Sequence, residues 1–452
     1  MKTEQVEEKV RATLRAVALD GVRAPADLAE KVVRRHGRRR FSQAAGVTVA
    51  VAAISAGAVF GFGGGGAGDH DRPARPAVSP QGWKPWQSDV PGGSDYGCVV
   101  DGSALYCGGS KYDAAKFDAN TGERLWTVKV NREGDGLRGP IAVRDGVVFA
   151  YRNHTAKNLP SGDYMGGTDL MAVDAGTGAV LWKVRMPQDD RTPQAAMLIK
   201  GAVLANTPSL RTMSALDPRT GKVMWSHTWA KGTICQRAVL EGVPHLACMR
   251  DAEKPDHTDV LRLDPATGHA EKVTTLPGGQ QLIGTSGNRM VLAAAREPGS
   301  KDLKLTVIDG SGEQTSRSCR SERKPAKLDV VGDHLISVSW KGEASACSLT
   351  TGKRLWTAPA GFELSEKDMA VGNMAPAVVS ATRGVVYLFG PGGDLSGLDL
   401  RTGEQVWHRH IETGEPSSGN IFEGSPQVLL YEDVLVARSG SKIVTLLPGN
   451  DD

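Results

Sequence analysis

Six cysteines are the residues of this chain most suited to covalent or metal chemistry, and their spacing favours disulfide bonds. Cys98 and Cys107 flank a turn region in "CVVDGSALYC", and Cys235 and Cys248 flank Glu241-Gly242 in the same way. Residues directly opposed in an antiparallel hairpin have Cβ atoms about 4.5–5.5 Å apart, near the upper end of disulfide geometry. Cys319 and Cys347 remain, and we pair them by elimination. An even cysteine count of this kind is typical of an oxidising compartment.

A metal site is the alternative use of these cysteines. The sequence has no Cys-x-x-Cys spacing and no histidine adjacent to a cysteine, so the pattern does not favour zinc. His408 and His410 in "WHRHI" would share one face of a strand, a spacing that a metal could use. Two ligands do not make a site, and we interpret both as surface residues.

Three other stretches suggest ligand chemistry, and each has a simpler interpretation. "DHTD" (256–259) is acidic but lacks the spaced oxygen ligands of a calcium loop, so we interpret it as a connector. "GPGGD" (390–394) lies between two strand patterns and not before a helix, which favours a hairpin over a phosphate cradle. Trp229 and Trp340 are interpreted as packing residues. No Ser/His/Asp or Cys/His set is recognisable, so we predict no catalytic, cofactor-binding or metal-ligating residue.

The charge distribution argues against nucleic-acid binding. Residues 1–40 hold 11 basic and 6 acidic side chains, whereas the rest of the chain holds 43 basic and 45 acidic ones. Neutralising nucleic-acid phosphates requires clustered Lys and Arg, and the large C-terminal part has no basic excess.

An uncharged stretch near the N-terminus predicts a transmembrane anchor. Residues 41–62, "FSQAAGVTVAVAAISAGAVFGF", are long enough to cross a bilayer as a helix and follow an arginine cluster that would stay in the cytoplasm. We therefore expect a basic, amphipathic helical tail at 1–40 in the cytoplasm, an anchor at 41–62, a Gly/Pro-rich linker at 63–82 and an extracytoplasmic domain at 83–449. A cleaved signal peptide is the alternative, and "RRRF" resembles a twin-arginine export signal.

A short motif recurs along the outer domain and predicts its fold. Each copy has an Asp or Ser that can fold a turn, a Gly that can adopt positive φ, and in most copies a Trp on the following strand. The copies are spaced by 40–56 residues, the range of propeller blades. The repeated residues are Asp118, Gly122, Trp126, Asp174, Gly178, Trp182, Asp217, Gly221, Trp225, Asp264, Gly268, Gly352, Trp356, Asp399, Gly403 and Trp407. The Trp is lost at Lys272 and after the shortened turn at Asp309.

Counting strands gives an all-β, eight-bladed propeller with four strands in each blade. A further hairpin precedes each turn, and seven units contain the turn or a remnant of it. The eighth unit, "VLLYEDVLVARSGSKIVTLLPG", has only three strands. The segment "GWKPWQSDVP", with Trp83 and Trp86, is expected to supply the fourth and to close the ring. Residues 83–449 then give about 46 residues per blade.

The repeat resembles that of the PQQ-like (quinoprotein) family, whose hallmark is Ala-x-Asp-x-x-x-Gly-x-x-x-Trp. "AVDAGTGAVLW" and "ALDPRTGKVMW" fit it well, and the resemblance covers roughly residues 83–449. The family includes PQQ-dependent alcohol dehydrogenases, the outer-membrane assembly factor BamB and membrane-attached sensor regions. The basic region and the Ala/Gly-rich anchor are similar in style to those of actinobacterial membrane proteins.

The resemblance implies a fold and leaves the activity open. The dehydrogenases add calcium ligands, a base Asp and commonly an adjacent Cys-Cys pair, and we could not map such a set onto this chain. PQQ and calcium are therefore not expected. BamB is closer in size, although it is a lipoprotein and this chain has no lipid-attachment cysteine. We expect a non-enzymatic module that binds a protein or cell-envelope ligand, with 153–167 and 250–259 as contact regions. The alternatives are a PQQ-dependent enzyme and a sensor that signals to the tail.

Overall fold

The computed structural model describes residues 75–89, 97–109, 111–129, 139–158, 164–187, 196–250, 255–294, 302–363, 374–412, 426–440 and 442–449. The predicted tail, the predicted anchor and the first part of the predicted linker lie outside these residues. Within the described ranges, no helix has both the length and the apolar character to cross a bilayer.

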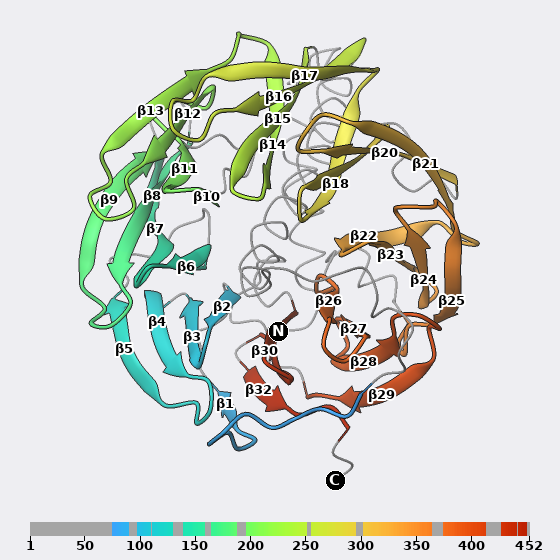
Figure 1. The fold of residues 1–452 in the computed structure, drawn as a ribbon. Coiled ribbons are helices and arrows are strands. Elements are labelled where there is room, and N and C mark those ends of the chain that lie inside the picture. The colour runs from blue at the N-terminus through green and yellow to red at the C-terminus, as the bar shows by residue number, and fades with distance from the viewer. Residues whose placement is uncertain are drawn as a thin grey trace, which may run out of the picture. The chain divides into compact units, whose positions relative to one another are not determined.

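Eight four-stranded antiparallel sheets surround a common axis, which confirms the predicted eight-bladed propeller (Figure 1). Each complete run of four strands forms one blade, from the inner strand at the axis to the outer strand at the circumference. Blade 1 contains β2 (Gly97–Asp101), β3 (Ala104–Gly108), β4 (Tyr112–Asp118) and β5 (Arg124–Lys129). Blade 2 contains β6 (Ala142–Arg144), β7 (Val147–Asn158), β8 (Tyr164–Asp174) and β9 (Val180–Met186). Blade 3 contains β10 (Met197–Ile199), β11 (Ala202–Asn206), β12 (Thr212–Leu216) and β13 (Val223–Thr228).

The remaining blades follow the same order. Blade 4 contains β14 (Thr233–Leu240), β15 (Val243–Arg250), β16 (His257–Leu263) and β17 (Ala270–Pro277). Blade 5 contains β18 (Gln280–Ser286), β19 (Arg289–Ala294), β20 (Asp302–Asp309) and β21 (Gln314–Arg320). Blade 6 contains β22 (Pro325–Val331), β23 (His334–Ser339), β24 (Glu343–Ser348) and β25 (Arg354–Pro359). Blade 7 contains β26 (Val378–Ser380), β27 (Val385–Phe389), β28 (Asp394–Asp399) and β29 (Gln405–His410).

Blade 8 joins the two ends of the domain. It contains β30 (Gln427–Tyr431), β31 (Val434–Ser439) and β32 (Lys442–Leu446), and its outer strand is β1 (Gln87–Asp89). β1 pairs with β32 in the register Gln87↔Val444. The segment that contains Trp86 therefore completes the last blade and closes the ring.

The repeated turn is built around one side-chain oxygen. In five copies the Asp Oδ1 accepts the backbone N–H groups of the residues two and three positions later; the aspartates are Asp118, Asp174, Asp217, Asp264 and Asp399. Ser348 replaces the carboxylate with a hydroxyl that accepts the Thr351 N–H at 3.1 Å. Bonds from the Thr177 and Thr220 backbone and side chains hold the pKa values of Asp174 and Asp217 below the usual range. The side-chain oxygen thus holds the turn in shape by bonding successive backbone N–H groups.

The Trp of one blade packs on the Gly of the next blade's turn. A Cβ added at Gly221 would lie 2.7 Å from Cδ2 of Trp182, and Gly221 has φ +68°, so glycine is needed there for two reasons. The indole Nε1 of Trp182 donates to the Pro218 carbonyl at 2.9 Å in the same turn. The same ring-on-glycine contact and indole bond recur for Trp86, Trp126, Trp225 and Trp356. These contacts form the seams between blades.

Trp407 has a different environment, because blade 8 has no such turn. It packs edge-on against Tyr387, with ring centroids 6.4 Å apart, and contacts the cluster that includes Val444 and Leu446 of blade 8. The repeated residues are therefore elements of packing, and each set belongs to two neighbouring blades.

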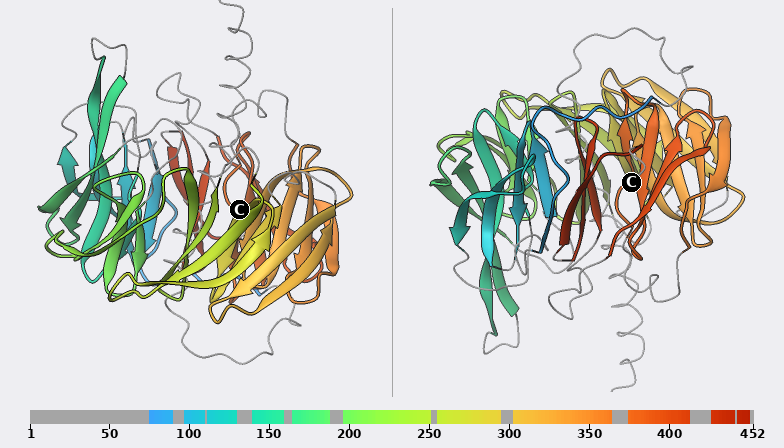
Figure 2. Two further views of the ribbon diagram at one scale, coloured as in Figure 1. Left: turned by 90° about the horizontal axis from the view of Figure 1, so that it is seen from above. Right: turned by 90° about the horizontal axis from the view of Figure 1, so that it is seen from below.

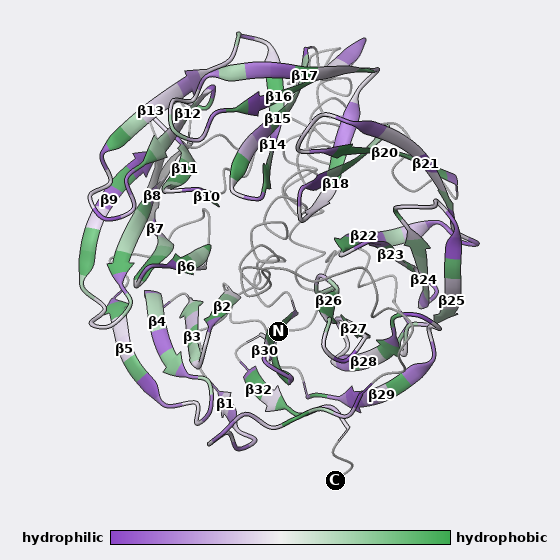
Figure 3. Ribbon diagram, in the orientation of Figure 1, coloured by the Kyte–Doolittle hydropathy of each residue, from purple (hydrophilic) through white to green (hydrophobic). Residues whose placement is uncertain are grey.

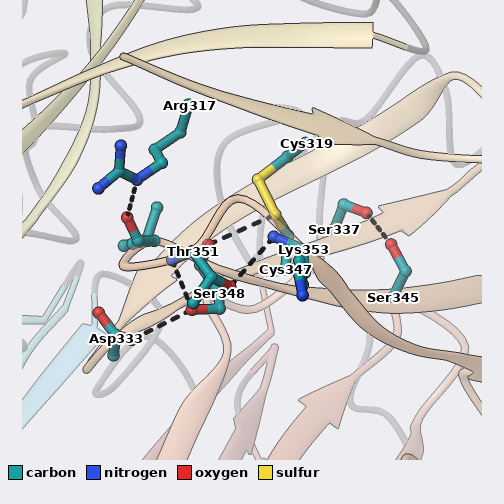
Figure 4. Close-up of a disulfide and its surroundings, with 10 residues drawn as sticks. Arg317, Cys319, Asp333, Ser337, Ser345, Cys347, Ser348, Thr351 and Lys353 are labelled. Atoms are coloured by element: carbon teal, nitrogen blue, oxygen red, sulfur yellow. Dashed lines mark hydrogen bonds between the residues drawn. A yellow bond between two sulfur atoms is a disulfide. The ribbon is translucent and has the colours of Figure 1, made fainter. Parts of the chain in front are cut away.

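The three disulfides have two different roles. Cys98–Cys107 and Cys235–Cys248 each join directly opposed residues of a hairpin, with Cα atoms 4.0 Å apart. Cys319–Cys347 instead joins β21 of blade 5 to β24 of blade 6, with Cα atoms 5.9 Å apart (Figure 4). This seam lacks a Trp, so the disulfide and the seam contacts around it take over the linking role.

Arginine replaces the indole at the seam between blades 5 and 6. The Arg317 Nε donates to the Leu349 carbonyl at 3.2 Å (Figure 4). A Cβ added at Gly352 would lie 3.4 Å from the Cδ of Arg317. At the seam between blades 4 and 5, Val273 lies against Gly312 in the same manner. The propeller therefore keeps the geometry of its seams where the Trp is missing.

Removing one seam indole should destabilise the propeller strongly. We expect Trp182→Ala to lower the free energy of unfolding by about 3–5 kcal/mol, because a buried aromatic side chain is lost and a cavity remains. Denaturant unfolding monitored by circular dichroism measures this loss. The neighbouring Leu181→Ala is the matched control, since Leu181 is 41% exposed, and it should change the stability by less than about 1 kcal/mol. Equal losses in the two variants would refute the seam assignment.

The turn carboxylates should make stability depend on acid. The pKa of Asp217 is lowered in the folded state by its Thr220 bonds. The stabilisation is therefore present above the unfolded pKa and disappears as the pH falls through the lower folded pKa. We expect the stability advantage of the wild type over Asp217→Asn to shrink between about pH 5 and pH 2. Urea unfolding at several pH values tests this, and a constant difference over that window would contradict it.

Candidate functional site

The ring has two distinct faces. Backbone bonds join the inner hairpin turn of a blade to its repeated turn, as in Ala119 N–H to the Ser103 carbonyl and Ala175 N–H to the Gly146 carbonyl. Both turns therefore lie at one end of the ring, which we call the turn face. The connections from the second to the third strand of each blade lie at the opposite end, which we call the loop face.

The chain enters the propeller across the turn face. Residues 75–86, which we call the strap, bond to turns of three blades: Arg75 N–H to the Arg383 carbonyl, Val78 N–H to Asp433 and Lys84 N–H to the Asn120 carbonyl. In the right-hand view of Figure 2 the blue strap crosses one side of the ring. Arg75, the first described residue, therefore lies on this face.

One hairpin projects from the loop face. β7 and β8 have 12 and 11 residues, whereas β11 and β12, their counterparts in blade 3, have five each. Their pairing continues to Asn158↔Tyr164, with an irregularity between His154 and Lys157. Figure 2 shows this teal and green hairpin extending beyond the ring on the side opposite the strap. Of the predicted contact region 153–167, residues 153–158 and 164–167 therefore lie on a paired strand extension.

The second predicted contact region, 250–259, spans the connection between β15 and β16 of blade 4. Of residues 250–259, the structure describes Arg250 at the end of β15 and the residues from 255 onward, which lead into β16. His257 lies between two carboxylates, with Nδ1 2.7 Å from Asp256 and Nε2 3.7 Å from Asp259. Asp259 also accepts the Thr275 hydroxyl at 2.6 Å, and this bond lowers its pKa. The "DHTD" stretch is thus a strand start whose charges are paired.

His408 and His410 converge on one carboxylate at the circumference. The His410 Nδ1 lies 2.9 Å from the Asp394 Oδ1, and the His408 Nε2 lies 3.7 Å from the same atom. Asp394 begins β28 and pairs with His410 across the strands. Throughout the described ranges, no group of three or more His, Cys, Asp or Glu side chains has the arrangement to hold a metal ion.

The other two candidate stretches belong to the framework. Residues 390–393 turn the chain between β27 and β28, with the Gly390 N–H donating to the Asp394 carbonyl at 2.9 Å. Trp229 is 9% exposed and packs in the core cluster shared by blades 3 and 4. Trp340 is half-buried in the turn between β23 and β24.

Buried polar side chains between the inner strands were not found by sequence reasoning. The Gln427 amide accepts from the Cys98 N–H at 2.8 Å and donates to the Cys98 carbonyl at 2.9 Å, linking blade 8 to blade 1. Gln236 makes the same double contact with the backbone at Leu282 and Gln280, linking blade 4 to blade 5. Asp329 accepts the Ala377 N–H at 3.1 Å across the seam between blades 6 and 7, and burial raises its pKa.

One buried cation lies among these contacts. Arg237 of blade 4 donates to the Asn206 side chain of blade 3, and burial lowers its pKa to about 10. Tyr151 of blade 2 lies near this charge and accepts the Ala196 N–H at 2.6 Å. Burial raises the pKa of Tyr151, so its hydroxyl stays protonated. These groups join blades 2, 3 and 4 and satisfy one another.

The described residues can be compared with the donor set of a calcium-bound quinone. All six cysteines form disulfides between residues distant in the chain, so none forms an adjacent pair. The buried Asp329 carboxylate is occupied by a backbone N–H and lies 3.9 Å from Lys327. The adjacent Cys-Cys pair that commonly lies beside such a group is therefore absent from the described residues, and we derive no chemical step through the group.

Comparisons with known proteins agree with the fold. The chain is 29% identical over 121 residues to a quinohemoprotein alcohol dehydrogenase of Comamonas testosteroni, a region that is 27% of this chain and 16% of that enzyme. The structure matches BamB from Moraxella catarrhalis with a TM-score of 0.50 and 15% identity, covering 82% of this chain and 98% of BamB. It matches the computationally designed protein Ika8 with a TM-score of 0.53 and 14% identity, covering 80% and 98% of the two chains. The two structural likenesses concern the fold alone.

A sequence family gives the more specific assignment. The family described as "Outer membrane protein assembly factor BamB" matches residues 76–244 and 253–448. These two segments include β1, which closes the ring, and every repeated turn. The chain belongs to this family of PQQ-like β-propellers.

Proposed function

We propose that this chain is a membrane-anchored, extracytoplasmic scaffold that binds a protein or cell-envelope ligand through the loop face of its propeller. The observation that carries the proposal is the β7–β8 hairpin, which extends from a closed, rigid ring on the face opposite the strap. Functional contacts commonly lie on loops that a rigid scaffold positions. A projecting hairpin on a closed ring is such an arrangement.

Three further features support this proposal. The family that the chain belongs to is described as an assembly factor, which is a binding role. The three disulfides suit an oxidising compartment outside the cytoplasm. The uncharged stretch at 41–62 behind an arginine cluster supplies a single-pass anchor with its N-terminus in the cytoplasm.

The second candidate function is a PQQ-dependent dehydrogenase, which the 121-residue similarity to the alcohol dehydrogenase favours. The two candidates predict different behaviour of the purified chain. An enzyme would bind PQQ stoichiometrically in the presence of calcium and reduce a dye with an alcohol substrate, and this result would overturn the scaffold proposal.

Shortening the projecting hairpin should abolish partner binding and leave the ring intact. Replacing residues 153–168 with Asn-Gly joins the cross-strand pair Arg152 and Asp169 directly and keeps a turn sequence suited to a hairpin. In-cell crosslinking followed by mass spectrometry should show the loss of the partners crosslinked to the wild type. Circular dichroism and thermal unfolding verify the fold.

A matched variant deletes residues 251–256, between β15 and β16, from the other candidate region, 250–259. We expect it to retain the crosslinked partners. If it loses them and the β7–β8 variant keeps them, then the contact is at blade 4 and the assignment to the hairpin is wrong.

A further inference from the structure

Five blades expose an apolar side chain at the same position of the outer strand. The residue directly before the seam Trp is Leu125, Leu181, Met224, Leu355 or Val406, and these side chains are 41–51% exposed. In each of these blades the pairing between the third and outer strands shifts at this residue, so it is the extra residue of a β-bulge. A bulge leaves its extra residue outside the ladder and discourages further strand pairing at that edge. The repeated feature is therefore an apolar side chain presented outward, not an open strand edge.

These side chains lie at the rim of the turn face. Each comes three residues after the turn glycine, at the start of the outer strand, as with Gly178 and Leu181. Figure 3 shows green hydrophobic segments on β9 and β13 at the outer edge of the ring. We call these five residues together with Val78 of the strap, which is 71% exposed, the apolar arc.

The apolar arc is centred on the strap. It includes blades 6, 7, 1, 2 and 3 and the strap itself, which crosses turns of blades 7, 8 and 1. Blades 4 and 5 are farthest from the strap, and the residues directly before their seam residues Val273 and Arg317 are Lys272 and Ser316, both polar and exposed. The apolar side chains thus gather on the side of the ring where the chain enters.

The distribution fits a flat partner. Residues in five blades at one end of a ring can all meet a plane, whereas a compact protein domain would cover only a few of them. The five turns that lead into the bulge residues carry equal numbers of basic and acidic side chains. The basic ones are Arg124, Arg219, Lys222, Lys353, Arg354 and Arg401, and the acidic ones are Asp118, Glu123, Asp174, Asp217, Asp399 and Glu404. Exposed apolar groups among balanced charges suit the interface of a lipid bilayer and do not require anionic lipid.

The tether also brings the turn face to the bilayer. The strap starts at Arg75, and 12 residues separate it from the end of the predicted anchor at Phe62. A fully extended chain of this length spans roughly 40 Å, and a Gly/Pro-containing linker spans less. The turn face is therefore held close to the membrane, and the β7–β8 hairpin points away from it.

We propose that the apolar arc rests on the surface of a lipid bilayer and fixes the orientation of the propeller. This inference depends on the membrane anchoring in the proposed function, and it adds a second, lipid-binding surface to the protein-binding loop face. The arc would place the hairpin perpendicular to the membrane, ready for a partner in the envelope.

Lipid quenching of single labels in the full chain tests this inference. The described cysteines are all in disulfides, so a cysteine introduced by Ala179→Cys, two residues before Leu181, can take a polarity-sensitive fluorophore. Gln314→Cys labels the matched place in blade 5. The full chain is combined with phosphatidylglycerol vesicles that carry doxyl lipid. We expect a blue shift and strong quenching at position 179 and neither at position 314.

The triple variant Leu125→Ser, Leu181→Ser and Met224→Ser provides the second measurement. These residues are exposed, so the fold should persist, and we expect the quenching at position 179 to fall to the level at position 314. Flotation with vesicles reports anchoring separately. If the chain floats with the vesicles but the label at position 179 is not quenched, the docking of the apolar arc is overturned and the membrane anchoring stands. If the label is quenched but the chain does not float, the membrane anchoring is overturned and the contact between arc and lipid stands. Crosslinking of a protein at position 179 without lipid quenching would make the arc a protein interface and overturn the inference.

Discussion

The contact between a Trp ring and a glycine of the next blade is the constraint on which this structure depends. A four-stranded blade has two apolar faces and cannot bury either one alone. At Gly221 the indole of Trp182 occupies the volume of a Cβ, and its N–H bonds to the turn that the Asp217 carboxylate holds in shape. Because turn and indole belong to different blades, each unit is completed by its neighbour. Repetition of the motif therefore follows from packing, in which the Trp and Gly of each motif are covered by a neighbouring blade.

The seams without a Trp show which part of the contact is essential. Between blades 5 and 6, the Arg317 Nε reaches the Leu349 carbonyl, the same place in the turn that an indole N–H reaches elsewhere. The Cys319–Cys347 disulfide adds a covalent link across that seam. In a chain-entropy account, a closed loop of this length contributes about 3–4 kcal/mol to stability. A directed N–H donor and an added crosslink thus substitute for aromatic area.

Much of this architecture could be predicted from the sequence, because the signal repeats. Asp118, Gly122 and Trp126 recur with fixed spacing. The last blade has only three strands of its own, so the segment with Trp86 was the remaining candidate for its fourth strand. Arg317 gave no such signal, since a single arginine in "SRSCR" looks like a surface residue until the strand register is known. The same holds for Gln427 and Gln236, whose inward direction depends on the neighbouring blade. The β7–β8 extension lies in a region that the sequence marked only as a long insertion. That its residues pair as strands could be seen only in the structure.

Ring closure through blade 8 places a demand on how the chain folds. Trp86 and Thr445, which bond at 3.1 Å, are 359 residues apart. During synthesis β1 emerges before every other strand of the ring, yet its only strand partner, β32, emerges last. Until then β1 has no strand partner, and the first and seventh blades each keep one apolar face in water. Pairing across so long a separation is slow, so the unclosed ring has a finite lifetime in which chaperones or neighbouring chains can bind it.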